Sequence, residues 1–92
     1  MNAYELVVIF SSELSPEEQK KIISKIAKTV HEAKGKVLSS DEWGKKTLSY
    51  PIKKNTEGYY WLLKMEASSQ TAVVLNNLLK LEDKVIRYML VQ

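Results

Sequence analysis

The sequence predicts an α+β fold in the order β-α-β-β-α-β, with a four-stranded antiparallel sheet and two helices on one face. Two stretches with helical apolar spacing alternate with four runs rich in β-branched and aromatic residues. The 92 residues are 45% hydrophobic and 27% charged, which is typical of one globular domain covering residues 1–92. Right-handed crossovers would place the first and third strands at the centre of the sheet. This order is that of a ferredoxin-like sandwich.

The first strand is predicted over Tyr4 to Phe10, because this apolar run is short and is followed by polar residues. The first helix begins after Ser15, which can cap it, and Pro16 suits its first position. Apolar residues then recur at helical spacing until Gly35. We expect Gly35 to end this helix in a left-handed conformation.

The second strand is predicted from Lys36 to Ile52. It contains Gly44, and a glycine inside a strand often marks a bulge or bend. Asn55 to Gly58 has the composition of a hairpin turn. The third strand, Tyr59 to Glu66, should therefore pair antiparallel with the second.

The second helix is capped by Ser68 or Ser69, and its apolar residues again fall on one face. The last strand is predicted over Val85 to Val91. These two elements complete the six expected from the pattern.

Alternation along the strands separates the two faces of the sheet. On the third strand, Tyr59, Trp61, Leu63 and Met65 form the more apolar set, so they should face the helices. The opposite register gives the other face an apolar centre fringed by charge. A protein partner is expected to cover this centre, although a homodimer or another register remains open. The patch consists of Val7, Ile9, Leu62 and Met89, with Glu5, Lys64 and Arg87 at its fringe.

Lysines cluster around the predicted hairpin, and the formal net charge of the chain is +3. Lys45, Lys46, Lys53 and Lys54 could contact phosphates of a nucleic acid. Lysines on an edge strand can equally prevent edge-to-edge aggregation. Both interpretations remain open on this evidence.

Catalytic and metal-binding groups are scarce. The chain has no cysteine and a single histidine, His31, which we expect at the helix surface. Its adjacent carboxylates, Asp41-Glu42 and Glu82-Asp83, should point to opposite faces or lie in solvated turns. No glycine-rich phosphate loop is present. We therefore expect no enzyme activity, no metal and no cofactor.

Targeting signals are also lacking. The start of the chain does not resemble a secretory signal, and no apolar run approaches the ~20 residues of a membrane span. We expect a cytoplasmic protein without a membrane partner or a small-molecule substrate.

The run from Gly44 to Lys53, GKKTLSYPIK, followed by Gly58-Tyr59, resembles the signature region of the bacterial small-subunit ribosomal protein S-six (S6) family. The opening Tyr4-Glu5 and the closing strand are similar at matching spacing, so the resemblance covers essentially the whole chain. Members of that family have a ferredoxin-like fold. They bind the central domain of small-subunit ribosomal RNA together with ribosomal protein S-eighteen (S18).

The resemblance implies roles for particular residues. By position, the RNA-binding candidates are Lys45, Lys46, Tyr50, Lys53 and Arg87. The resemblance adds Tyr60 to the partner-binding candidates, beside Val7, Ile9, Leu62 and Met89. The chain departs from the family pattern at two places. Members of the family usually carry a charged or amide side chain at the position of Thr47, and often basic side chains at Asn2-Ala3.

Two other functions compete with this interpretation. An RNA-recognition motif shares the element order and reads single strands on aromatic side chains of its central strands. In the register above, Tyr59 and Trp61 point into the core, which leaves a poor stacking platform. A ferredoxin-like regulatory module that binds a ligand or dimerises is a third possibility, without a ligand motif to support it.

Overall fold

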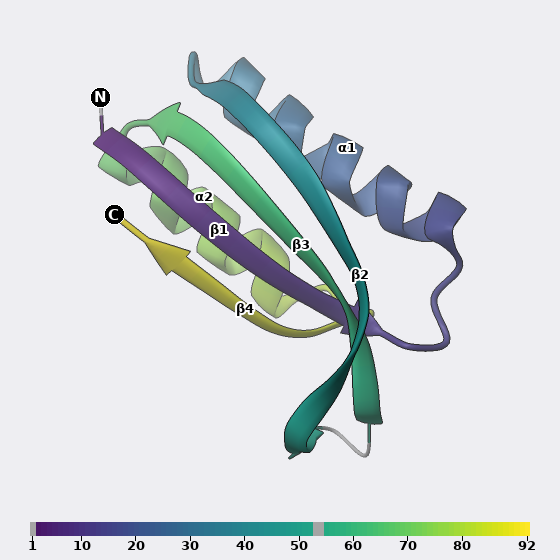
Figure 1. Cartoon of the computed structure of the whole chain (residues 1–92). Coiled ribbons are helices and arrows are strands. Elements are labelled where there is room, and N and C mark those ends of the chain that lie inside the picture. The colour runs from purple at the N-terminus through teal and green to yellow at the C-terminus, as the bar shows by residue number, and fades with distance from the viewer. Residues whose placement is uncertain (1, 53–54) are drawn as a thin grey trace.

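The computed structural model follows the predicted order, and the structure describes residues 2–52 and 55–92, with only the backbone described at 49–52 and 55. The elements are β1 (Asn2–Ser11), α1 (Pro16–Glu32), β2 (Lys36–Ile52), β3 (Asn55–Ala67), α2 (Ser69–Lys80) and β4 (Val85–Val91). The sheet has the order β2-β3-β1-β4 and all its pairs are antiparallel. Both helices lie on the same side of the sheet (Figure 1). The predicted α+β, ferredoxin-like arrangement is confirmed.

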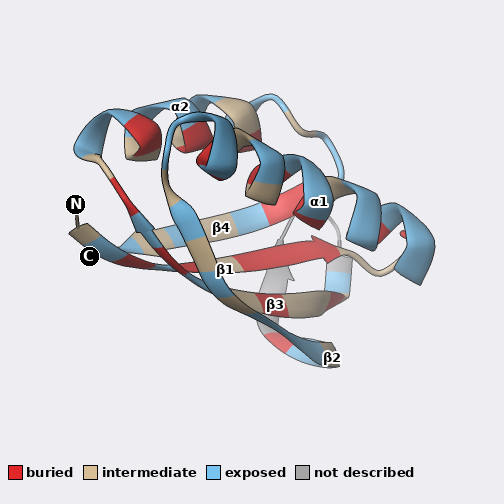
Figure 2. Ribbon diagram, turned by 90° about the horizontal axis from the view of Figure 1, so that it is seen from above, coloured by how far each residue is buried: buried red, intermediate tan, exposed pale blue. Residues whose placement is uncertain are grey.

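The main core fills the space between the two layers (Figure 2). Every second residue of the central strands points into it, as the alternation predicts. The apolar stripes of the two helices close it from the other side. Its buried members include Leu6, Val8 and Phe10 of β1, Trp61, Leu63 and Met65 of β3, Ile23, Ile26 and Val30 of α1, and Leu75 and Leu79 of α2.

The polar side chain of Gln19, on α1, is fully buried. Its amide nitrogen donates to the carbonyl oxygen of Leu14 at 3.1 Å, and its Oε1 accepts from Nε1 of Trp61 at 3.0 Å. The bridge satisfies an indole N–H that would otherwise be buried without a partner. It also fixes Trp61 on the helix side of the sheet, so this ring is not part of the open face.

Both helices begin at serine caps. The Oγ of Ser15 accepts from the backbone N–H of Glu18 at 3.2 Å, and the Oγ of Ser68 accepts from that of Thr71 at 3.3 Å. Each bond satisfies one of the amides that a helix start leaves without an intrahelical partner. Of the two predicted caps for α2, Ser68 is the one used.

The end of α1 differs from the prediction at Gly35. The left-handed residue is Lys34, with φ 66°, and not the glycine. The N–H of Gly35 bonds to the carbonyl of Val30 at 2.8 Å, and that of Lys34 to His31 at 2.9 Å, which is a Schellman motif. A Cβ on Gly35 would lie 2.8 Å from the carbonyl oxygen of Glu66. The glycine thus allows the chain to pass close to β3.

The predicted turn at Asn55 to Gly58 is wrong, because these residues belong to β3. Asn55 is already opposite Ile52, and Gly58 is opposite Lys46. Only residues 53 and 54 separate the strands. The role of Gly58 is steric, since a Cβ there would lie 2.6 Å from Cγ2 of Ile9.

The bulge predicted at Gly44 is confirmed. The pairing of β2 with β3 shifts between Glu42 and Gly44, and Gly44 has φ 84°. An added Cβ would meet nothing within 4 Å, so glycine is needed there for its backbone conformation.

Candidate functional site

The face of the sheet opposite the helices has rows of side chains that run across the strands. Residues directly opposite each other in a sheet point to the same face. Met89, Val7 and Leu62 are consecutive in one row, from β4 through β1 to β3. In the next row, Val91, Glu5 and Lys64 are consecutive. The open face therefore places an apolar row beside a row with one carboxylate and one ammonium group.

The apolar row is partly open to solvent. Met89 is 50% exposed, and Val7 and Leu62 are half-buried. Val91, in the neighbouring row, is 49% exposed. The structure thus brings together three of the five candidates for partner binding, Val7, Leu62 and Met89.

The other two candidates for partner binding, Ile9 and Tyr60, are opposite each other in the next row. Ile9 lies on the open face as expected, but only 7% of it is exposed. It forms a second small cluster with Leu48 and Ile86, against which Tyr60 packs half-buried. The expectation of an exposed Ile9 is wrong, because the hairpin of β2 and β3 folds Leu48 over it. Tyr60 keeps an accessible part.

The candidates for RNA binding do not form one cluster. Lys46 is exposed near the end of β2, and Nζ of Lys45 lies 3.6 Å from a carboxylate oxygen of Glu57. Arg87 is exposed on β4, at the opposite edge of the sheet. Its row continues through Ile9 and Tyr60 to Gly44. Three strand spacings separate the two edges, about 14 Å.

Two more of the RNA-binding candidates, Tyr50 and Lys53, lie outside the described side chains. Lys53 is not described at all, and neither is the side chain of Tyr50. The structure places only Lys45, Lys46 and Arg87 of that set.

Two exposed apolar side chains of β2 were missed by the sequence reasoning. Leu38 is 54% and Trp43 is 49% exposed. Each occupies the extra position of a register shift, between Val37 and Ser39 and between Glu42 and Gly44. The signal for Trp43 was available, since the predicted bulge at Gly44 implies that a neighbouring side chain leaves the regular alternation.

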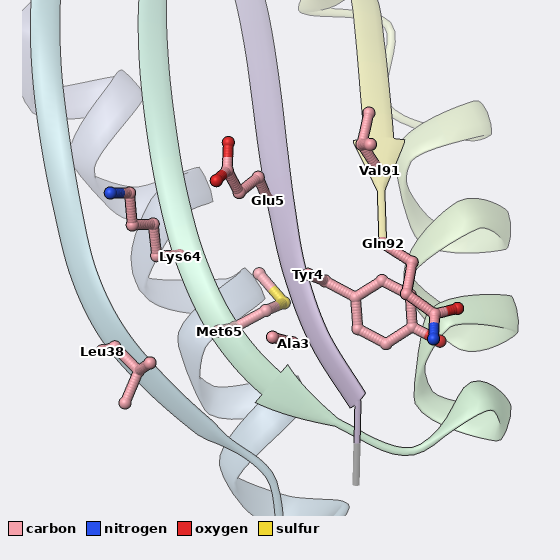
Figure 3. Close-up of a pocket in the computed structure, with 8 residues that line it drawn as sticks. All are labelled: Ala3, Tyr4, Glu5, Leu38, Lys64, Met65, Val91 and Gln92. Atoms are coloured by element: carbon pink, nitrogen blue, oxygen red, sulfur yellow. The ribbon is translucent and has the colours of Figure 1, made fainter.

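A depression of about 340 Å³ lies at the end of the open face where both termini meet (Figure 3). Its surface is mostly apolar, with the carboxylate of Glu5 and the ammonium group of Lys64 on neighbouring strands. This volume is at the small end of the range for ligand pockets. The lining residues are Ala3, Tyr4, Glu5, Leu38, Lys64, Met65, Val91 and Gln92.

The described part of the chain offers little for catalysis. Within residues 2–52 and 55–92, no group of three or more His, Cys, Asp or Glu residues could hold a metal ion. His31 is exposed at the end of α1, as expected. Asp41 and Glu42 are opposite Leu62 and Trp61, so they point to different faces of the sheet. None of the helices described is long and apolar enough to cross a membrane.

The fold and this surface define a class: an α+β protein of ferredoxin-like topology with helices on one face and a partly apolar, charge-fringed sheet on the other. Comparison with known families narrows the class. The family model described as "Ribosomal protein S6" matches residues 3–92, and the chain belongs to this family.

Individual relatives agree with this assignment. The "Small ribosomal subunit protein bS6" of Caldanaerobacter subterraneus subsp. tengcongensis is 35% identical over 92 residues, which is 100% of this chain and 97% of the relative. The protein of the same name from Alkaliphilus oremlandii is 38% identical over the same shares. The crystal structure of 30S ribosomal protein S6 from Thermotoga maritima superposes with a TM-score of 0.90 at 26% identity, covering 97% of this chain and 84% of that chain. The resemblance found in the sequence is confirmed.

Proposed function

We propose that this protein is a structural, non-catalytic component of the small ribosomal subunit that binds the central domain of small-subunit ribosomal RNA together with ribosomal protein S18. It would do so in the cytoplasm and as one domain. The observation that supports the proposal best is the partly exposed apolar row of Met89, Val7 and Leu62. Arg87 lies in the next row on β4, and Lys46 lies further along β2, beyond Asp41 at the end of the row.

The row suits a protein partner because it is apolar, partly exposed and located on a rigid sheet. Monomeric proteins seldom leave such a surface without a partner. The mostly apolar depression at the end of the face continues this surface and could receive a partner side chain. Docking there would leave the lysines of the β2 edge open to RNA.

The position of the cations supports a shared RNA surface. Lys46 and Arg87 are on opposite edges of the sheet. RNA that contacts both cations would therefore also contact a partner docked on the face between them. Each phosphate contact adds affinity that does not depend on sequence and that salt weakens. Specificity would then depend on RNA shape and on the partner.

Charge substitutions test the RNA half of the proposal. With S18 present, Lys46→Ala or Arg87→Ala should weaken binding to a central-domain RNA fragment and reduce the slope of log affinity against log salt by about 1. Lys28→Ala is the matched control, because Lys28 is an exposed lysine on α1, in the other layer. Its Nζ lies 3.8 Å from Oε1 of Glu32. If both test variants kept the affinity and salt slope of the unmodified protein, the RNA half would fail.

A second pair of substitutions tests the protein half. Met89→Glu places a charge in the apolar row and should abolish association with S18 at concentrations where the unmodified protein binds it. Val73→Glu is the control, since Val73 is 61% exposed on α2. Equal loss in both variants, or in neither, would contradict docking on the open face.

The RNA-recognition-motif alternative loses its main support. Trp61 is 6% exposed and hydrogen-bonded to Gln19, and Tyr59 packs against the core on the helix side. The open face of β3 therefore has Tyr60 as its aromatic residue, and that ring is half-buried.

A further inference from the structure

Trp43 is an exposed indole that neither the core nor the apolar row explains. Tryptophan is highly buried on average, yet Trp43 is 49% exposed, against 6% for Trp61. It lies on β2, an edge strand, close to the lysines proposed to contact RNA. The question is what an aromatic ring does at that position.

The backbone shows how the ring is presented. Glu42 is opposite Trp61 and Gly44 is opposite Tyr60, so Trp43 is the extra residue of a β-bulge. Bulges re-aim side chains and are frequent next to functional sites. Gly44 holds the left-handed conformation, and apart from its two chain neighbours no atom lies within 4 Å of where its side chain would be.

The charged residues on the two sides of Trp43 in the sequence have opposite signs. Lys45 and Lys46 follow the bulge, and both are exposed. Asp41 and Glu42 precede it and would repel a phosphate. A nucleic-acid backbone that passes Trp43 should therefore run towards the lysines. Of these, Lys45 is already near Glu57, so Lys46 is the better phosphate ligand.

An exposed aromatic ring beside cations is the combination that binds single-stranded nucleic acid. Bases stack on the ring while the cations neutralise the backbone. A base inside a duplex is stacked on both sides and cannot use an external ring. Trp43 therefore suits an unpaired nucleotide.

We propose that Trp43 stacks on an unpaired base of the bound RNA, adjacent to a phosphate held by Lys46. The inference rests on the proposed RNA binding and adds a residue and a substrate class to it. The RNA recognised at this edge has an unpaired nucleotide in a loop, a bulge or a strand end.

The test uses a labelled central-domain RNA fragment, S18 and three variants of the full chain. Trp43→Leu should weaken RNA binding about 5- to 160-fold, the range expected for loss of one base–aromatic stack. Trp43→Phe should recover most of the affinity, because it keeps an aromatic face. Val74→Ala is the control, since Val74 is also an apolar residue that is 49% exposed, but it lies on α2 in the other layer. It should leave the affinity unchanged.

Fluorescence adds an independent readout. RNA should quench the emission of the unmodified protein, and the signal that remains in Trp43→Phe comes from buried Trp61 and should not respond. Trp43→Leu binding as tightly as the unmodified protein would overturn the inference and leave the proposed function intact. No RNA binding by the unmodified protein would overturn both.

Two further outcomes would also overturn the inference. If Trp43→Leu weakened association with S18 measured without RNA and had no separate effect on RNA, the indole would belong to the protein interface. A fully paired RNA that binds as tightly as one with an unpaired nucleotide would remove the stated substrate class.

Discussion

Replacing Gln19 by methionine tests whether the bridge to Trp61 stabilises the fold as described. Methionine has nearly the same length, so it fills the space and removes only the hydrogen bonds. The variant leaves the Nε1–H of Trp61 and the carbonyl of Leu14 buried without their partner. Each unsatisfied buried group costs about 1–3 kcal/mol, so we expect a loss of about 2–6 kcal/mol in the free energy of unfolding.

Urea unfolding at 25 °C measures this loss. The slope of the unfolding free energy is about 1–3 kcal/mol/M for small proteins, so the midpoint should fall by about 1–3 M with the slope unchanged. In a thermal scan, the Tm should fall by about 10–45 °C. Gln19→Ala should cost about 1 kcal/mol more than Gln19→Met, because it also leaves a cavity.

A double-mutant cycle separates the hydrogen bond from general damage to the core. Trp61→Phe removes the indole donor, so Gln19→Met should be less harmful in that background by at least about 1 kcal/mol. A Gln19→Met variant within about 0.5 kcal/mol of the unmodified protein would show that the bridge to Trp61 does not stabilise the fold. So would strict additivity with Trp61→Phe.

The glycines of the β2–β3 hairpin give two predictions that differ in mechanism. Gly44→Ala should cost about 1–2 kcal/mol through its left-handed backbone alone, since a Cβ has free space there; Gly44→Asn should recover most of this loss, because asparagine tolerates that conformation. Gly58→Ala should cost about 1–3 kcal/mol through the clash with Ile9, and Gly58→Asn should recover nothing. Urea midpoints of the four variants check both expectations, and the same response to asparagine at the two sites would contradict them.

Strong local signals made most of the fold predictable. The bounds of β4, Val85–Val91, and of β2, Lys36–Ile52, are those predicted, because each run is delimited by polar or turn residues. Ser15 and the alternation along β3 gave the right helix start and the right faces. These signals depend on residues close in the sequence, where capping and periodicity act directly.

The errors come from contacts between segments far apart in the sequence. Gly58 was interpreted as a turn residue, whereas it makes room for Ile9 of another strand. Gly35 was interpreted as a left-handed stop, whereas its approach to β3 requires the missing Cβ and Lys34 adopts the left-handed conformation. A glycine shows that something needs its small size or its freedom, but the sequence does not say which.

The face of the sheet that each candidate residue occupies could be predicted from the sequence, whereas the exposed fraction of its side chain could not. Alternation placed Val7, Leu62 and Met89 on one surface, and the register puts them side by side. It could not show that Leu48 covers Ile9, because that depends on how far the hairpin curls over the sheet. Trp43 differs, because its exposure follows from the bulge that Gly44 predicts.

The proposed shared surface is tested most directly by binding a labelled central-domain RNA fragment at one fixed salt concentration. Three mixtures are compared: this protein alone, S18 alone, and the two together. We predict tight binding only when both proteins are present, because the cations at the two edges act with the partner between them. Equally tight binding by this protein alone, or no binding by the pair, would contradict it.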